Sequence, residues 1–213
     1  GLYERFGSDS FDAFYVDAEN DPSIPKTTVK AQELILDLLK ERAETGRIYI
    51  MNIDHCNTHS SFKDSIYMSN LCQEITLPTD PITHIDDTAG EISLCILSAI
   101  NIGKVKSDEE LEELCELSVR SLEELIDYQG YPVAAAERAT KARRSLGVGF
   151  IGLAHYLAKL GFKYDSQEAW DAVHGLSESF QYYLLKSSNK IAEEKGWCEN
   201  FGRTKYADGI LPI

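Results

Sequence analysis

The stretch EISLCILSAINI at residues 91–102 is the feature that most constrains how this chain folds. Its apolar part, residues 92–100, is interrupted by two serines and is about half of the roughly 20 residues that a membrane-spanning helix needs. A short run this rich in Ile and Leu is typical of a buried strand. A second run, RIYIMNI at residues 47–53, alternates in polarity and is also predicted to be a buried strand. Strands among helical segments indicate an α/β protein, either one domain or part of one.

Helical spacing of apolar residues predicts most of the remaining elements. A helix is expected to begin at Thr27 or Thr28 and to end at Gly46. Ser107 and Glu110 form a capping-box pattern, which predicts a helix from there to Gly130. Further helices are expected over residues 133–145, 148–159 and 167–194, and a short extended piece over residues 14–16.

The charge of the chain restricts its partners. It has 21 Lys and Arg against 35 Asp and Glu, a formal net charge of −14 at pH 7. Such a chain repels polyanions, and its densest basic cluster is only Lys141, Arg143 and Arg144. We therefore expect no nucleic-acid partner and no membrane partner.

The cysteines and the chain ends suggest where the protein works. Its five cysteines are an odd number, lie far apart and form no C-x-x-C pair, which favours a reducing compartment, the cytoplasm. Residues near Gly1 show no secretory signal. The lack of a starting Met and the apolar end at residues 209–213 suggest a segment of a longer protein.

Residues 70–74, NLCQE, are the most informative stretch for chemistry. In an extended chain the side-chain period is two, so Asn70, Cys72 and Glu74 are predicted to project to one side. A thiol flanked by an amide and a carboxylate is a reactive combination. The alternative is a strand end with a half-buried cysteine and two solvated polar residues.

The other cysteines and histidines have simpler interpretations. Cys95 lies in the apolar stretch and is interpreted as core packing, although neighbouring strands could bring it near Cys72. Cys115 is expected in the core. Two histidines and a cysteine resemble a zinc-ligand set, but no fourth ligand is near, so structural polar groups are expected there rather than a metal. These three residues are His55, Cys56 and His59.

A G-x-G-x-x-G pattern at residues 147–152 resembles a dinucleotide-binding loop. That interpretation requires a preceding strand, whereas residues 137–145 read as a charged, Ala-rich helix. The glycines are therefore predicted to allow close helix packing.

The segment MSNLCQEITLPT, followed by GEISLCILSAIN, resembles the large catalytic subunit of class I ribonucleotide reductase, in its bacterial and bacteriophage form. RIYIMNIDHCNTHSSF, DYQGYP, ARRSLGVGFIGLAHYLAKLG, FQYYLLKSSNKIA and TKYADGILPI extend the resemblance over nearly the whole chain. It implies part of a ten-stranded α/β barrel of two half-barrels with a central finger loop. Residues 1–66 would end the first half-barrel, residues 67–78 would form the finger loop, and residues 91–213 would begin the second half-barrel.

The resemblance also implies roles for residues. Cys72 would form a thiyl radical that removes the 3′ hydrogen of a ribonucleoside diphosphate, and Glu74 would accept the proton of the 3′ hydroxyl. Asn70 would hydrogen-bond the substrate hydroxyls, with Leu71 and Gln73 completing the substrate-binding loop. Cys95 would be one member of a redox dithiol whose partner lies outside this chain.

Partners and cofactors follow from the same resemblance. The radical would come from a separate small subunit with a metal/tyrosyl cofactor, and thioredoxin or glutaredoxin would reduce the enzyme. ATP and deoxynucleotide effectors would bind mainly outside this segment, which itself is expected to hold no cofactor. Because the remaining parts of the large subunit are also required, these 213 residues alone are predicted not to turn over.

Two other functions stay open. The chain could be a non-catalytic fragment that only completes a barrel. It could instead be a Cys/His hydrolase that pairs Cys72 with His55 or His59, which requires an imidazole close to the sulfur.

Overall fold

The computed structural model describes residues 2–5, 8 and 10–211, leaving aside the side chains of residues 3 and 4. The chain divides into two compact units. The first unit comprises residues 1–79 and 202–213, and the second comprises residues 80–201. A short 3-10 turn, η2 (Phe201–Arg203), spans the boundary in the sequence.

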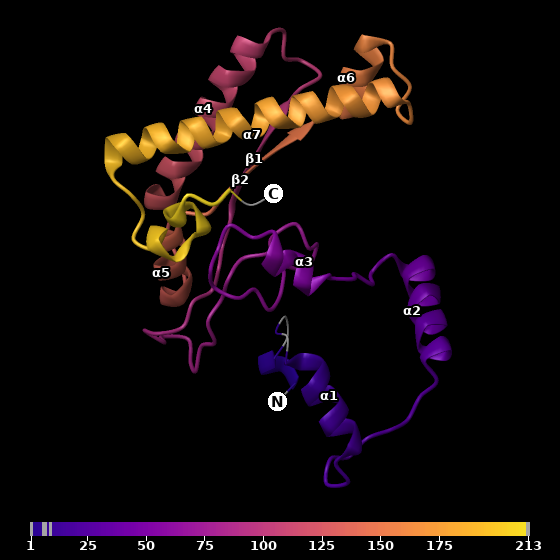
Figure 1. Ribbon diagram of the computed structural model, residues 1–213. Helices are drawn as coiled ribbons and strands as arrows, with labels where there is room; N and C mark the ends of the chain where they lie inside the picture. The colour runs from indigo at the N-terminus through magenta and orange to yellow at the C-terminus, as the bar shows by residue number, and fades with distance from the viewer. Residues whose placement is uncertain (1, 6–7, 9, 212–213) are drawn as a thin grey trace. The chain divides into compact units, whose positions relative to one another are not determined.

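The described part of the first unit is helical and irregular (Figure 1). Its helices are η1 (Leu2–Arg5), α1 (Phe11–Asn20), α2 (Ala31–Thr45), α3 (Ile53–Thr58) and η3 (Lys205–Asp208). The predicted end of α2 is confirmed, because Gly46 takes a left-handed φ of 66° and its N–H reaches the carbonyl of Arg42. Neither α1 nor α2 buries a residue completely.

Three extended segments predicted in the first unit are wrong. Residues 14–16 lie inside α1, and residues 70–74, treated above as extended, form a turn. Residues 47–52 are irregular, residue 53 begins α3, and Tyr49 and Ile50 are 47% and 53% exposed. A strand is stabilised by a neighbouring strand, and no backbone hydrogen bond between residues 47–51 and another strand occurs in the described part of the chain.

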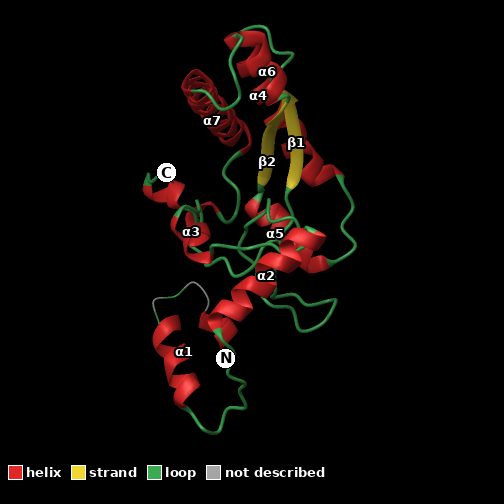
Figure 2. Ribbon diagram, turned by 90° about the vertical axis from the view of Figure 1, so that its right-hand side faces the viewer, coloured by secondary structure: helices red, strands yellow, loops and turns green. Residues whose placement is uncertain are grey.

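The second unit is α/β, as predicted, with a parallel pair of strands (Figure 2). Strand β1 (Ile96–Asn101) pairs with β2 (Leu146–Ile151) in the register that places Leu97 opposite Gly147. The helices are α4 (Asp108–Tyr128), α5 (Ala134–Arg143), α6 (Leu153–Leu160) and α7 (Gln167–Lys195). Among the described residues only these two strands form a sheet.

The core of the second unit lies between one face of this sheet and the two long helices. Ile100 of β1, Leu111 and Cys115 of α4, and Phe180 of α7 are buried together. Phe150 of β2 packs edge-on against Phe180, with ring centroids 5.6 Å apart. The alternate residues of both strands therefore point to the opposite face, away from this core.

The structure corrects two predicted elements of the second unit. Strand β1 begins at residue 96, not 91. Residues 148–159 are predicted to be one helix, but the first part of this segment belongs to β2 and the helix α6 follows it. Gly152, with a φ of 80°, then separates β2 from α6. The alternation that places Val148 and Phe150 on the core face explains why this segment is a strand.

The predicted start of α4 is confirmed. The Ser107 hydroxyl accepts a hydrogen bond from the Glu110 N–H at 3.3 Å, and the Glu110 carboxylate accepts one from the Lys106 N–H at 2.6 Å.

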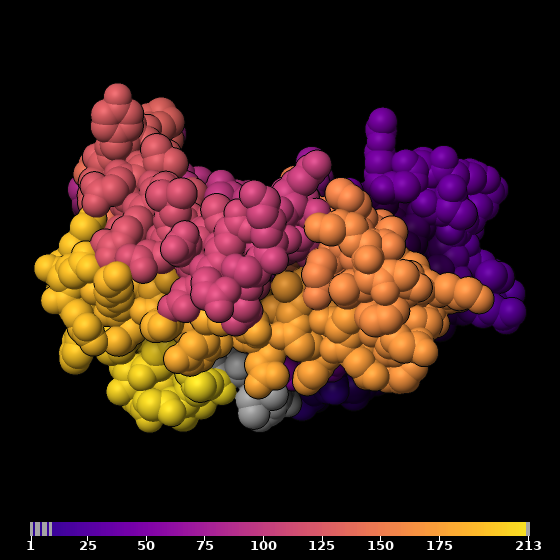
Figure 3. All heavy atoms as spheres, turned by 90° about the horizontal axis from the view of Figure 1, so that it is seen from above, coloured from indigo at the N-terminus to yellow at the C-terminus, as the bar shows by residue number. Residues whose placement is uncertain are grey.

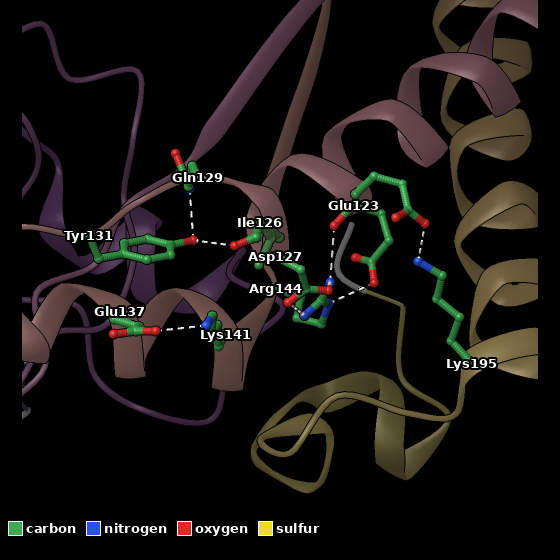
Figure 4. A network of polar contacts seen from close by, with 10 residues as sticks. Glu123, Ile126, Asp127, Gln129, Tyr131, Glu137, Lys141, Arg144 and Lys195 are labelled. Atoms are coloured by element: carbon green, nitrogen blue, oxygen red, sulfur yellow. Dashed lines mark hydrogen bonds and ion pairs between the residues drawn. The ribbon is translucent and has the colours of Figure 1, made fainter.

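Ion pairs hold the residue that leads from α5 into β2. Arg144, in a left-handed conformation with a φ of 49°, donates to Glu123 and Asp127 of α4, both at 2.7 Å (Figure 4).

Candidate functional site

The predicted reactive segment forms a closed turn in the first unit. The Asn70 N–H donates to the Ile75 carbonyl at 3.3 Å, and the Ile75 N–H donates to the Asn70 side-chain oxygen at 3.0 Å. Within this closure, the Gln73 N–H reaches the Asn70 carbonyl at 3.2 Å, and Gln73 has a left-handed φ of 62°. Cys72 and Glu74 are both exposed around this turn.

This geometry differs from the prediction. Asn70, Cys72 and Glu74 do not lie on one face of a strand, because the chain reverses direction at Gln73. A left-handed glutamine is not foreseeable from sequence, since Gly and Asn are the usual residues at such positions. The structure does keep the three polar residues within one turn of six residues.

Buried residues anchor both ends of the segment that carries the turn. Ile66, fully buried, exchanges two hydrogen bonds with the Asn57 side chain of α3, at 2.8 and 2.9 Å. Pro78 is also buried, at the other end of the segment. Farther back, Phe62 forms an antiparallel bridge with Thr204. The segment that carries the exposed turn is therefore held at both ends by buried residues.

Cys95 lies in the second unit, whereas Cys72 lies in the first. It directly precedes β1 and is half-buried, which corrects the prediction of a buried strand position. Its thiol contacts the Ile96 carbonyl at 3.8 Å, the range of a weak S–H hydrogen bond. A side-chain carbon placed on Gly147 of β2 would lie 3.0 Å from the Cys95 sulfur.

The segment before Cys95 is anchored by contacts that sequence reasoning missed. The Glu91 carboxylate accepts from Arg143 of α5 at 2.6 Å, with both side chains almost completely buried. The Ile92 N–H donates to the Ala135 carbonyl in the first turn of α5, at 3.3 Å. These partners are more than 40 residues apart in sequence, so no local pattern could have revealed them.

The other cysteines fall into simpler environments. Cys115 is fully buried in the core, as predicted, and burial raises the pKa of its thiol to about 11, with the carboxylate of Glu112 adding to the shift. Burial also raises the pKa of the half-buried Cys198. Cys56 is half-buried in α3. Burial and a raised pKa are features of unreactive thiols at Cys115 and Cys198.

The histidines near Cys56 contact each other rather than a thiol. The rings of His55 and His59 meet edge to face, with centroids 5.8 Å apart, and His59 Nδ1 lies 3.0 Å from the His55 carbonyl. In the described part of the chain, the Cys72 sulfur makes no hydrogen bond to either imidazole. No group of three or more His, Cys, Asp or Glu arranged to hold a metal occurs among the described residues. The structure therefore does not form the Cys/His pair that a hydrolase needs.

The glycine pattern does not form a nucleotide-binding loop. Gly147 and Gly149 lie within β2, and Gly152 caps α6, so no strand precedes the pattern and no loop links the glycines. The predicted role in helix packing is also wrong for Gly147, whose missing side chain leaves room for neighbours on β1 and for Cys95.

An apolar hollow in the second unit has no cysteine in its lining. It has a volume of about 380 Å³ between α6 and the start of α7 and is lined by Leu157, Trp170 and His174, among others. Tyr164 and Trp170 are 65% and 60% exposed on this surface, which is orange in Figure 3. The described helices include none that is both long and apolar enough to cross a membrane.

Comparison with known proteins identifies what the chain resembles. The family model described as the barrel domain of ribonucleotide reductase matches residues 1–213. The chain is 56% identical over 218 residues to the ribonucleoside-diphosphate reductase subunit alpha of Haemophilus influenzae, covering 100% of this chain and 29% of that protein. It is 51% identical to ribonucleoside-diphosphate reductase 1 subunit alpha of Escherichia coli, again over 100% of this chain and 29% of that protein. It is 43% identical to the subunit alpha of Enterobacteria phage T4, over 96% of this chain and 27% of that protein. The chain spans less than a third of the length of these curated relatives.

Proposed function

Because the chain belongs to the ribonucleotide reductase family, we propose that it is the central part of a catalytic subunit that reduces ribonucleoside diphosphates to deoxyribonucleoside diphosphates. In this proposal it contributes to a ten-stranded barrel of two half-barrels. Residues 1–66 end the first half-barrel, residues 67–78 form the finger loop, and residues 91–213 begin the second. The parallel pair of β1 and β2 with helices on one face supports this, because barrels of this class are built from such units.

One observation carries the assignment of the site. The hydrogen-bonded turn between Asn70 and Ile75 holds Cys72 and Glu74 exposed on an anchored segment. A radical thiol and a general base that act on one sugar need to be close together and accessible. The side-chain oxygen of Asn70 closes the turn, whereas its amide nitrogen has no hydrogen-bond partner among the described residues. That nitrogen is available to donate to a substrate hydroxyl.

The proposed reaction assigns one task to each residue. The Cys72 thiyl radical removes the 3′ hydrogen and later returns it, and Glu74 accepts the 3′ hydroxyl proton. Asn70 orients the hydroxyls, and Leu71 and Gln73 complete the loop. The 2′ hydroxyl leaves as water, and Cys95 with a second cysteine supplies two electrons and two protons as the pair becomes a disulfide. In the net change, one C–O bond and two S–H bonds are broken, one C–H, one S–S and one O–H bond are formed, and one water is released.

The proposal includes the partners of the complete enzyme and its location in the cytoplasm. The radical comes from a separate small subunit with its own metal/tyrosyl cofactor, and thioredoxin or glutaredoxin restores the dithiol. The remaining parts of the large subunit supply the second cysteine and the sites for ATP and deoxynucleotide effectors. The proposed mechanism therefore uses side chains of this chain for hydrogen and proton transfer and needs no cofactor bound to it.

The test is reduction of labelled cytidine diphosphate by the complete large subunit with its small subunit. Cys72→Ser and Glu74→Gln are expected to abolish deoxycytidine diphosphate formation, whereas Cys56→Ser, which removes the other thiol of the first unit, a half-buried one, should leave it intact. Normal turnover by Cys72→Ser would overturn the assignment. Binding of the 213-residue chain to its complementary pieces, with no effect of Cys72 or Cys95 substitution, would instead favour a purely structural fragment.

A further inference from the structure

We propose that Gly147 is a positioning residue for Cys95: by lacking a side chain, it leaves open the space that the reduced Cys95 sulfur occupies beside β2. This inference rests on the proposed function, in which Cys95 is one thiol of the redox pair. It assigns a role to a glycine whose sequence motif does not bind a nucleotide.

The observation is a close approach on the face of the sheet that points away from α4 and α7. Gly147 pairs with Leu97 in the parallel register. A Cβ atom on Gly147 would lie 2.4 Å from Leu97 Cδ2 and 3.0 Å from Cys95 Sγ. Leu97 is 55% exposed, so its side-chain end has room to turn aside. The contact that is harder to relieve is therefore the one with the sulfur.

The backbone around Cys95 has little freedom to retreat. The buried ion pair between Glu91 and Arg143 and the hydrogen bond from Ile92 to Ala135 hold the preceding residues against α5. The Cys95 thiol itself contacts the Ile96 carbonyl at 3.8 Å. An added methyl group on residue 147 would therefore press on the sulfur rather than displace the strand.

The contact between a methyl group on residue 147 and the Cys95 sulfur would mainly affect one redox state, the dithiol. In the oxidation step, two S–H bonds break and one S–S bond forms, while two electrons and two protons pass to the ribonucleotide, whose hydroxyl leaves as water. The Cys95 sulfur must then lie about 2 Å from the second sulfur. The backbone of β2 occupies the side toward Gly147, so the second sulfur, which lies outside this chain, has to approach Cys95 from another side. In this proposal the Cys95 sulfur moves toward it and away from Gly147. A methyl group at residue 147 would disfavour the dithiol and leave the disulfide less affected.

The chain offers a matched control. Gly149 lies in the same strand, and a Cβ placed on it would meet nothing within 4 Å. Neither Gly147 nor Gly149 has the left-handed φ that alanine would avoid. Gly147→Ala and Gly149→Ala therefore make the same change in strand propensity and differ in what the new methyl group touches.

The experiment compares these variants in the complete large subunit. The equilibrium of the Cys95 disulfide with dithiothreitol is measured by differential alkylation and mass spectrometry of the Cys95 peptide. Gly147→Ala is expected to shift this equilibrium about tenfold toward the disulfide, equivalent to about 30 mV for a two-electron couple. Product from pre-reduced enzyme without added reductant should stay at the wild-type yield, while steady-state turnover falls. Gly149→Ala should match the wild type in all three measurements.

Two further variants distinguish a failure of this inference about Gly147 from a failure of the proposed function. The double variant Leu97→Ala with Gly147→Ala removes the clash with the Leu97 side chain, the closer of the two, and should stay folded. If the contact with the Cys95 sulfur is responsible, this variant still shows the shift of the equilibrium toward the disulfide. Loss of the shift in this double variant, or the same equilibrium in Gly147→Ala and Gly149→Ala, would overturn the inference. Normal steady-state turnover by Cys95→Ser would overturn the redox role of Cys95 itself, and with it the proposed function.

Discussion

Arg143 and Glu91 form an ion pair that is almost completely buried, with Nη2 of the guanidinium 2.6 Å from the carboxylate and side-chain exposures of 3% and 9%. The Arg143 Nε also donates to the same carboxylate oxygen, at 2.8 Å. The pair joins the last residue of α5 to the segment that leads to Cys95 and β1. Its geometry thus links helix packing to the placement of a thiol that the proposed function uses.

Breaking this pair should destabilise the fold more than replacing it. Arg143→Ala leaves the Glu91 carboxylate buried without its cation, which typically costs about 3–5 kcal/mol. The double variant Arg143→Met with Glu91→Leu removes both charges and should unfold at nearly the wild-type urea concentration. The measurement is urea unfolding of the complete subunit. Equal losses in the single and double variants would contradict this reasoning.

Asn70 should have two separable roles. Its side-chain oxygen accepts from the Ile75 N–H, and Asn70→Asp keeps that acceptor while removing the amide donor. Asn70→Leu removes both and should cost about 1 kcal/mol in turn stability. We expect Asn70→Asp to keep the wild-type resistance of the loop to proteolysis and to lose most of its turnover of cytidine diphosphate. Full turnover by Asn70→Asp would argue against hydrogen bonding to the substrate through the amide nitrogen.

Gln73 should accept glycine better than a β-branched residue. Its φ of 62° costs an L-residue about 1–2 kcal/mol, which glycine avoids. Gln73→Gly is therefore expected to keep the turn closed, and Gln73→Val to open it. Limited proteolysis within residues 70–75 reports the opening. Faster cleavage of Gln73→Gly than of Gln73→Val would contradict the prediction.

Local signals in the sequence were sufficient for one end each of α2 and α4. Ser107 with Glu110, and Gly46, act within one turn of the elements they cap, and the structure confirms both. The strands depended on distant neighbours. Residues 146–151 form a strand because they pair with β1, a partner about 50 residues away, so the helical spacing predicted for this segment was misleading.

The candidate site was predictable in its residues and not in its conformation. The sequence of residues 70–74 drew attention to Cys72 and its polar neighbours, and the structure places them on one exposed turn. The left-handed Gln73 and the anchor from Asn57 to Ile66 have no local signal. The pair of Glu91 with Arg143 joins residues 52 apart, and only the folded chain reveals it.

Acid should weaken the loop that precedes Glu91. The Asp87 carboxylate accepts backbone N–H groups of Thr83, Ala89 and Gly90 and the Thr83 hydroxyl, and the Thr83 N–H contributes most to holding its pKa well below the ordinary value. The unfolded chain binds this proton at a higher pH than the folded chain, so the stabilisation is present above about pH 4 and is lost as the pH falls further.

Asp87→Asn tests this expectation. The variant should melt at a lower temperature at pH 7 and lose less stability than the wild type between pH 5 and pH 3. The control is Asp86→Asn, because Asp86 is the exposed neighbour. Parallel acid profiles for wild type and Asp87→Asn would show that this carboxylate does not contribute to acid sensitivity.

Alkaline conditions should weaken the core through Cys115. Burial raises the pKa of this thiol to about 11, so the folded chain keeps its proton at a pH where the unfolded chain, with an ordinary thiol pKa near 8.5, has released it. Fewer protons bound in the unfolded state mean that stability falls as the pH rises from about 9 toward 11. Cys115→Ala removes this contribution and costs about 1 kcal/mol at pH 8 through the lost packing. Urea unfolding at pH 8, 9 and 10 should therefore show a steeper decline in stability for the wild type than for the variant.

Cys115 should also resist Ellman's reagent at pH 8 until urea is added, because it is fully buried, whereas the exposed Cys72 reacts in the folded protein. Equal pH slopes, or rapid labelling of Cys115 without urea, would place this thiol outside the core.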